Sequence, residues 1–345
     1  SAAYAREATG DGITIAVVDS GGPWDADGDL ANNEFNSTSS EIVKPDDSDY
    51  VNSDSVPEDL YNHGVPVGCL IRCDRGDTDM HGIAYDATVS WYKIFDSSGT
   101  ATSNSNVASA LNAADSNDII NNSWGTTSNG CSSESNCEST IGSSTFAAMK
   151  TATDTNGKIL VWAAGNSGNS NPGAEAHAVV HTSELQGLTV VVVAINATNA
   201  DGSGSADGKI WSSSNRCGDA ATYCIAAPGA DITTVSRVNG QTFVVGNGTS
   251  FAAPLVSGGL AIIKEEFSSL SNAQVVSRLF STALDTDEYS QTSIYGHGLM
   301  NLNAATTAVG KLETINGSNL LDDPNTSYYD LVDNSFSSSA AFSNA

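Results

Sequence analysis

Hydrophobic residues along the chain form short apolar runs that alternate with longer segments of helical periodicity. The predicted strands are residues 13–18, 88–95, 118–121, 159–163, 188–195 and 223–226. The predicted helices are residues 63–72, 105–116, 139–153, 250–267 and 273–283. Several strands are continuously apolar, which is typical of strands whose two faces are both covered. The alternation predicts an α/β fold, a mostly parallel central sheet with helices on both faces.

Polar stretches between these elements predict loops and a domain boundary. Residues 25–59 are acidic and rich in Asn and Ser and predict an irregular surface insertion, and residues 126–138 and 199–220 predict further loops. Helix and strand signals fade beyond about residue 310. We therefore predict one large domain over residues 1–310 and an extended tail or stem over residues 311–345.

The chain contains no apolar run long enough to predict a transmembrane helix, which needs about 18 residues. A signal peptide starts with a basic region that is followed by an apolar region. The first residues, Ser-Ala-Ala-Tyr, do not fit this pattern, so we predict no signal peptide in this sequence. Thirteen Lys and Arg against 40 Asp and Glu give a net charge of −27. Nucleic acid and anionic membranes repel such a surface, so neither is an expected partner.

The six cysteines form three close couples, Cys69 with Cys73, Cys131 with Cys137, and Cys217 with Cys224. An even number and short separations favour local disulfides in an oxidising compartment. Buried free thiols are the alternative. A metal site is a further alternative, but no CxxC pair stands near a His. The first couple has a four-residue offset on a predicted helix, which demands particular side-chain directions.

A Gly-Thr turn at residues 248–249 leads into Ser250 and then into a predicted helix. Ser250 therefore lies at a helix N-terminus, where N–H groups and the helix dipole favour negative charge. A nucleophilic Ser needs such a place because acyl transfer creates an oxyanion beside it. The alternative is that Ser250 only caps the helix.

Three more polar residues stand at the ends of predicted elements. Asp19 follows a buried strand, where open α/β sheets place their ligand sites, although Asp also commonly starts a turn. His63 opens a predicted helix and could act as a base, or lie at the surface or in the core. Asn166 follows an apolar strand in a Gly-rich turn, where its amide could donate to an oxyanion or serve the turn alone.

Each of these residues is ambiguous alone, but their order is informative. Asp19, His63 and Ser250 follow the chain order Asp, His, Ser found in subtilisin. The sequence resembles the subtilisin-like serine proteases from residue 12 to about 310. The resemblance lies in residues 17–21, 63–64, 82–84, 122–125, 163–166, 227–229 and 248–254. Residues 295–310 are similar to the C-terminal pattern of bacterial autotransporter passenger subtilases.

The resemblance implies a subtilisin-like fold and a secreted serine endopeptidase that works through an acyl-enzyme intermediate. It implies that Ser250 attacks the scissile carbonyl, that His63 moves its proton, and that Asp19 orients His63. Asn166 and the Ser250 N–H would bind the oxyanion. The residues implied to bind substrate are Ser123, Trp124, Gly125, Ala163, Ala164 and Gly165. Residues 123–125 would pair with extended substrate, and Trp124 would line the specificity pocket or be a core aromatic.

Four of the six residues after His63 depart from the family pattern. Members usually continue Gly-Thr-His-Val-Ala-Gly after the catalytic His, whereas this chain has Gly-Val-Pro-Val-Gly-Cys at residues 64–69. Pro66 is compatible with a first helical turn, where its missing N–H is not needed. Cys69 could tie this helix to the loop behind it. Catalysis is not put in doubt, but the pocket near His63 would differ in shape.

No cofactor is expected for the chemistry, but a structural calcium ion is a hypothesis. Relatives often bind calcium through a loop after the His-bearing helix and an upstream carboxylate. The residues at these positions are Asp29, Asp77 and Asp79. Clustered carboxylates suit calcium, and a solvated acidic loop is the alternative. The expected partner is a polypeptide substrate, and we expect a monomer. The competing functions are a peptide-binding homologue without activity and an adhesin-like passenger.

Overall fold

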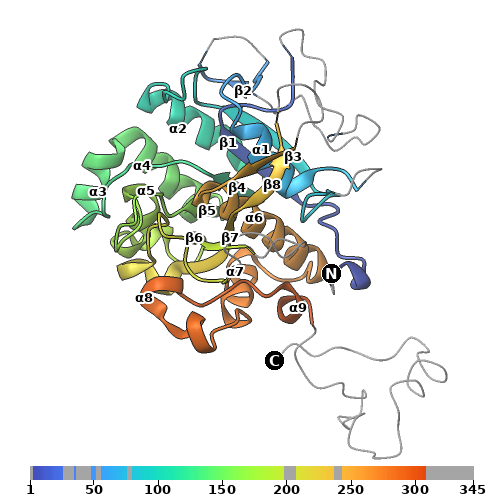
Figure 1. The fold of residues 1–345 in the computed structure, drawn as a ribbon. Coiled ribbons are helices and arrows are strands. Elements are labelled where there is room, and N and C mark those ends of the chain that lie inside the picture. The colour runs from blue at the N-terminus through green and yellow to red at the C-terminus, as the bar shows by residue number, and fades with distance from the viewer. Residues whose placement is uncertain are drawn as a thin grey trace, which may run out of the picture. The chain divides into compact units, whose positions relative to one another are not determined.

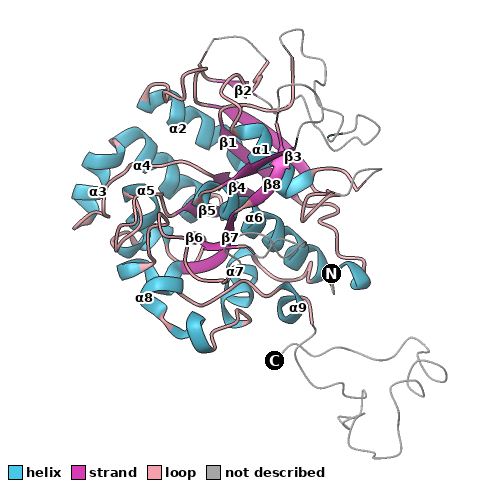
Figure 2. Cartoon of the chain, viewed as in Figure 1, coloured by secondary structure: helices cyan, strands magenta, loops and turns pink. Residues whose placement is uncertain are grey.

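The computed structural model describes residues 3–25, 35, 48–51, 56–75, 80–197, 207–236 and 243–307. A parallel seven-stranded sheet lies at the centre, in the order β2-β3-β1-β4-β5-β6-β7 (Figures 1 and 2). Its strands are β1 (Thr14–Asp19), β2 (Ser48–Asp49), β3 (Thr88–Lys93), β4 (Ile119–Asn122), β5 (Ile159–Ala163), β6 (Thr189–Asn196) and β7 (Cys224–Ala230). The predicted mostly parallel central sheet is therefore confirmed.

The sheet separates two hydrophobic layers, because successive side chains of a strand point to opposite faces. Ile15 and Val17 of β1 join the layer under helices α1, α6 and α7. Ala16 and Val18 join the opposite layer, under α2, α3, α4 and α5 (Figure 1). The bounds of these helices are α1 (Gly64–Arg72), α2 (Asn104–Ala113), α3 (Glu134–Ile141), α4 (Ser143–Lys150), α5 (Ala174–His177), α6 (Thr249–Glu266) and α7 (Asn272–Ser281). Helices on both faces are therefore confirmed as well.

Several helices begin at local signals that the sequence carries. The Ser103 hydroxyl accepts from the Asn106 N–H at the start of α2, and Ser271 and Gln274 form a capping box at the start of α7. Two short helices, α8 (Thr292–Tyr295) and α9 (Leu302–Ala305), follow α7. None of the helices in the described ranges is long and apolar enough to cross a lipid bilayer.

The structure differs from the prediction in four respects. Residues 134–138 lie in α3, not in a loop, and the single helix predicted over residues 139–153 is interrupted at Gly142, whose φ is 98°. That left-handed conformation suits glycine and separates α3 from α4. Strand β2 lies within the predicted insertion at residues 25–59, and β8 (Ile232–Val235) forms an unpredicted antiparallel hairpin with β9 (Phe243–Gly246).

All three predicted disulfides are present. Cys69 in α1 is bonded to Cys73, the residue directly after the helix. The other bridges are Cys131–Cys137 and Cys217–Cys224. The bridge at Cys69 therefore ties the end of α1 to the first residue of the loop behind it, as predicted. The predicted tail, residues 311–345, lies outside the described residues, so the boundary near residue 310 stays a prediction.

Candidate active site

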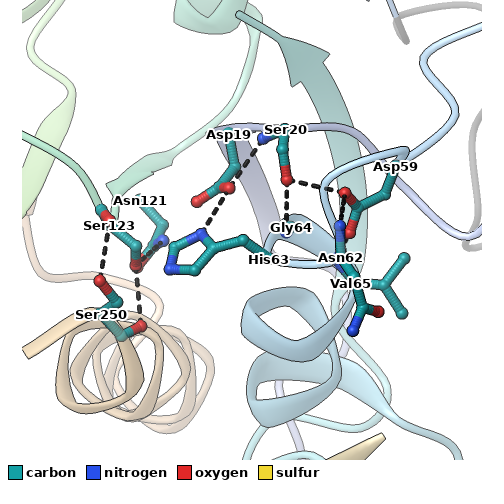
Figure 3. Close-up of polar contacts among 10 residues, drawn as sticks. All are labelled: Asp19, Ser20, Asp59, Asn62, His63, Gly64, Val65, Asn121, Ser123 and Ser250. Atoms are coloured by element: carbon teal, nitrogen blue, oxygen red, sulfur yellow. Dashed lines mark hydrogen bonds and ion pairs between the residues drawn. The ribbon is translucent and has the colours of Figure 1, made fainter. Parts of the chain in front are cut away.

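The candidate nucleophile, base and orienting carboxylate come together at one edge of the sheet. Asp19 is the last residue of β1, His63 directly precedes α1, and Ser250 is the second residue of α6. Figure 3 shows the His63 ring between Asp19 and Ser250. Carboxyl ends of parallel strands form the usual ligand edge of an open α/β sheet. The fold therefore joins three residues that are far apart in sequence.

The contact between Asp19 and His63 fixes the imidazole. His63 Nδ1 lies 2.7 Å from Asp19 Oδ1, which also accepts a 2.7 Å hydrogen bond from the Ser20 N–H. An ionised carboxylate can only accept, so Nδ1 carries the proton. The second ring nitrogen, Nε2, is then an acceptor, and Figure 3 shows it on the side of the ring that faces Ser250. This is the tautomer that a general base needs.

The surroundings of His63 set its pKa. Burial lowers the pKa of His63, but the charge of Asp19, its hydrogen bond and the charge of Asp59 act in the opposite direction and outweigh burial. The pKa of His63 therefore lies above its ordinary value of 6.5. Opposite charges nearby favour the protonated form of an imidazole. The same charges would stabilise an imidazolium formed during a reaction.

A second buried carboxylate, Asp59, holds the segment that carries His63. Its Oδ1 accepts from the Ser20 hydroxyl at 2.8 Å and from the Asn62 N–H at 2.7 Å, and its Oδ2 accepts from the Val65 N–H at 2.8 Å. The Ser20 hydroxyl in turn accepts from the Gly64 N–H at 2.9 Å (Figure 3). Asp59 and Ser20 together thus accept from the N–H groups of Val65 and Gly64 at the start of α1 and tie them to the chain beside Asp19.

Replacing Asp59 by Asn is expected to destabilise the fold and to change the pH dependence of activity. The amide would place an N–H₂ group against one of the donors, and an unsatisfied buried donor costs about 1–3 kcal/mol. Loss of the charge also removes one influence that raises the pKa of His63. Activity requires unprotonated His63, so the acid-side midpoint of kcat/KM should move to lower pH. Thermal unfolding and pH–rate profiles measure the two effects.

The matched control is the exposed Asp154, which loses the same charge in Asp154→Asn. It should leave both the unfolding midpoint and the pH profile in place. An Asp59→Asn enzyme with the wild-type acid limb would contradict the electrostatic role of Asp59.

Ser250 is held against the end of β4 by a reciprocal pair of hydrogen bonds. Its hydroxyl donates to the Ser123 carbonyl at 3.0 Å, and the Ser123 hydroxyl donates to the Ser250 carbonyl at 3.0 Å (Figure 3). Asn121 donates to the Ser123 hydroxyl at 3.0 Å and accepts from Ser257, further along α6, at 2.9 Å. The helix that carries Ser250 is therefore locked to the central sheet by buried polar contacts.

Asn166 lies in the turn after β5 and faces the start of α6. Its Oδ1 accepts from the N–H and from the hydroxyl of Thr249, both at 2.9 Å. The Thr249 hydroxyl also accepts from the Gly165 N–H at 3.1 Å. Because the oxygen end of the amide is occupied by Thr249, its N–H₂ end is the part left for another acceptor.

Two cavities adjoin these residues. The larger, about 400 Å³, is lined by Asp19 and His63, and the smaller, about 250 Å³, by Asn166 and Ser250. Residues 123–126 and Glu175 line both cavities. The predicted substrate-binding residues fall here, since Ala163, Ala164 and Gly165 line the smaller cavity and Ser123, Trp124 and Gly125 line both.

Trp124 lies between the cavities and the core beneath them. It is only partly buried, and its ring contacts Trp162 edge-on at 4.9 Å between centroids. A second edge contact joins it to Phe95 at 6.2 Å. Its aromatic surface therefore packs on the core and also forms part of the cavity wall.

The predicted calcium ligands Asp29, Asp77 and Asp79 lie outside the described residues. Neighbouring Asp74 is described, and its carboxylate lies 3.1 Å from Arg72 Nη1. Across the described ranges no three His, Cys, Asp or Glu side chains gather in a way that could hold a metal ion. The calcium site stays a prediction.

Asp59 and Glu175 lie at the site but were not predicted from the sequence. A carboxylate shortly before a helix start is a capping signal, so Asp59 could have been found from its place ahead of α1. Glu175 gave no such signal, because α5 has only four residues and its neighbour Thr126 is 49 positions away.

The fold and the arrangement of Asp19, His63 and Ser250 define a class of protein. Residues 10–298 match the subtilase family, and the chain belongs to that family. It is thereby a subtilisin-like serine peptidase by class.

Particular relatives include both secreted bacterial proteases and subtilisins. The chain is 27% identical over 362 aligned positions to the extracellular serine protease of Serratia marcescens, which covers 88% of this chain and 32% of the relative. It is 28% identical over 310 positions to subtilisin E of Bacillus subtilis (strain 168), covering 88% of this chain and 68% of the relative. The chain thus spans about a third of the length of the Serratia protein.

Solved structures show the same fold. The protease domain of PatA, solved as a Ser-to-Ala mutant, matches with a TM-score of 0.65 and 21% identity, over 86% of this chain and 95% of that one. A cold adapted subtilisin-like serine proteinase matches with a TM-score of 0.60 and 22% identity, over 85% and 88%. These likenesses confirm the subtilisin-like architecture.

Proposed function

We propose that this chain is a secreted serine endopeptidase that cleaves polypeptides through an acyl-enzyme intermediate. The observation that carries the proposal is the 2.7 Å contact between His63 Nδ1 and Asp19 Oδ1, which leaves the other ring nitrogen, Nε2, on the side toward Ser250. A base held by a third group beside a hydroxyl is the arrangement that activates a nucleophile. Secretion is supported by three disulfides and by the extracellular Serratia relative.

In the first step the Ser250 hydroxyl turns from the Ser123 carbonyl toward His63 Nε2. Its oxygen forms a bond to the scissile carbonyl carbon while its proton moves to Nε2, and the carbonyl electron pair moves onto oxygen. When this intermediate collapses, the carbon–nitrogen bond breaks and His63 returns the proton to the leaving amine. Water then repeats the sequence on the acyl-enzyme and regenerates the Ser250 hydroxyl. Asp19 stays ionised and stabilises the imidazolium.

The oxyanion would be held by the Asn166 amide and by the Ser250 N–H. The contacts of Asn166 Oδ1 with Thr249 orient the amide so that its N–H₂ end is the donor available to substrate. The Ser250 N–H lies in the first turn of α6, where the helix dipole favours negative charge. Donors fixed before the reaction are worth more than donors that must reorganise.

Residues 123–125 and 163–165 would receive the substrate, because they line the cavities beside Ser250. Backbone pairing of an extended peptide along residues 123–125 would place its carbonyl between Ser250 and Asn166. The chemistry needs no cofactor in this scheme. A calcium ion at Asp29, Asp77 and Asp79 would serve stability only.

Covalent labelling with a fluorophosphonate tests this proposal directly. We expect native protein, supplied with calcium, to be labelled at Ser250 and to hydrolyse a denatured protein substrate. Protein that is folded but neither labels nor hydrolyses would favour a homologue that only binds peptides, or an adhesin-like passenger.

A further inference from the structure

Glu175 is a buried acidic side chain at the site that the proposed mechanism does not use. It belongs to α5, is only 5% exposed, and lines both cavities. In the cavity beside Ser250 it is the sole charged residue among the lining residues that the structure describes. The rest of that lining is small, aromatic or neutral polar. Glu175 is therefore the group in this wall that could distinguish a charged side chain from a neutral one.

The position of the carboxylate is fixed from one side. Glu175 Oε2 accepts from the Thr126 N–H at 2.8 Å and from the Thr126 hydroxyl at 3.0 Å. A side-chain carbon added at Gly125 would lie 3.1 Å from the same oxygen. The carboxylate therefore lies directly beneath residues 125–126, the segment that also lines both cavities. Glycine at position 125 leaves no side chain between the carboxylate and the backbone above it.

Among the described residues, Glu175 has hydrogen-bond donors but no cationic partner. In the described part of the chain no Lys, Arg or His forms an ion pair with it. Burial raises the pKa of Glu175, and the hydrogen bonds from Thr126 only partly oppose this. A buried carboxylate without a counter-charge is costly, and a cation entering the cavity would relieve that cost. The cavity opens beside Ser250, so the cation can come from the substrate.

We propose that Glu175 makes this site select substrates with Lys or Arg at the residue that contributes its carbonyl to the cut bond. This inference rests on the proposed function, because that residue is defined by attack of Ser250. Ser250 and Glu175 both line the cavity of about 250 Å³, so a basic side chain that enters it from the residue attacked by Ser250 can reach the carboxylate. The net charge of −27 also favours basic substrates, because it attracts cationic segments at long range.

Matched peptides that differ only in charge at that residue provide the test. One pair carries arginine or its uncharged isostere citrulline, and a second pair carries lysine or norleucine. A hydrogen-bonded charge is worth about 1.5–3 kcal/mol, so kcat/KM should be about 10- to 100-fold higher for the basic member of each pair. Equal rates within both pairs in the wild-type enzyme would overturn the inference without any variant.

Glu175→Gln then assigns the preference to this residue. The glutamine carbonyl can still accept from Thr126, so a role limited to holding Thr126 predicts an unchanged ratio. Our inference predicts that the arginine-to-citrulline ratio falls to near one, mainly through slower cleavage of the arginine peptide. The exposed Glu138 gives a matched control, because Glu138→Gln removes the same charge away from both cavities. An equal fall of the ratio in the control would also overturn the inference.

The outcomes separate this inference from the proposed function. Cleavage of citrulline and norleucine peptides as fast as their basic partners leaves the endopeptidase in place and removes the role of Glu175. Absence of cleavage of all four peptides and of a denatured protein, with no fluorophosphonate labelling of folded protein, overturns the proposed function and this inference together.

Discussion

Ser250→Ala is expected to lower kcat by about 10⁶-fold, the magnitude measured for the triad of subtilisin, which belongs to the same family. Alanine cannot form the acyl-enzyme, so the two-step route is lost. The remaining activity would come from the oxyanion donors and from substrate binding alone. Removal of the hydroxyl also breaks the 3.0 Å hydrogen bond to the Ser123 carbonyl. That contact is only one of several that hold α6 to the sheet, so the variant should fold.

Steady-state hydrolysis and fluorophosphonate labelling measure this effect, and circular dichroism checks the fold. His63→Ala should fall to a similar level, and the double variant should lose little more, because the two residues act as a unit. The exposed Ser269 is a matched control, since Ser269→Ala removes a hydroxyl just beyond the end of α6. Folded Ser250→Ala protein with substantial activity would rule out Ser250 as the nucleophile.

Asn166→Asp is expected to lower kcat by about 10²–10³-fold or more, the loss found when one oxyanion donor is removed from subtilisin. The carboxylate can still accept from the N–H and hydroxyl of Thr249, so the turn should keep its shape. It offers no donor and adds a negative charge where negative charge would develop. KM should change much less than kcat, because the missing interaction forms mainly in the transition state.

Thr249→Val separates donation by Asn166 from its orientation. This variant removes the hydroxyl that donates to Asn166 and accepts from the Gly165 N–H, but leaves the amide donors in place. We expect a loss of about tenfold, the order of one neutral hydrogen bond. If Asn166→Asp retained kcat within a few-fold of wild type, the oxyanion would have to be held by other groups.

Much of the fold could be predicted because its signals are local. Buried strands such as residues 159–163 are continuously apolar, and the observed β5 has the predicted bounds. The helix with Ser250 was predicted from the Gly-Thr turn and the apolar run that follows, and α6 differs from that prediction by one residue at each end. The four candidate catalytic residues each stand near the beginning or end of a predicted strand or helix. Their positions could therefore be predicted once these elements were predicted, and they are Asp19, His63, Asn166 and Ser250.

What the sequence could not show depends on contacts between distant segments. Residues 134–138, the first part of α3 and the part that was predicted as a loop, are mostly polar and carry no apolar stripe that would distinguish them from a loop. Strand β2 has two residues and exists through its pairing with β3. Glu175 reaches Thr126 only because the start of α5 lies against the segment that follows β4, so its place at both cavities is a tertiary property.

The contact between Ser20 and Asp59 has a consequence for how this protein can vary. It joins positions 39 residues apart, and the neighbouring Gly22 and Glu58 are bridged as well. The two ends of the segment between them are therefore held together beside Asp19 and His63. The contacts at these ends, and not the length of the segment, fix the positions of Asp19 and His63. Loop-closure entropy grows only slowly, by about 0.6 kcal/mol for each doubling of length. Insertions between Phe35, which packs in the core, and β2, which pairs with β3, should therefore be tolerated by the site, so a further module could be grafted there.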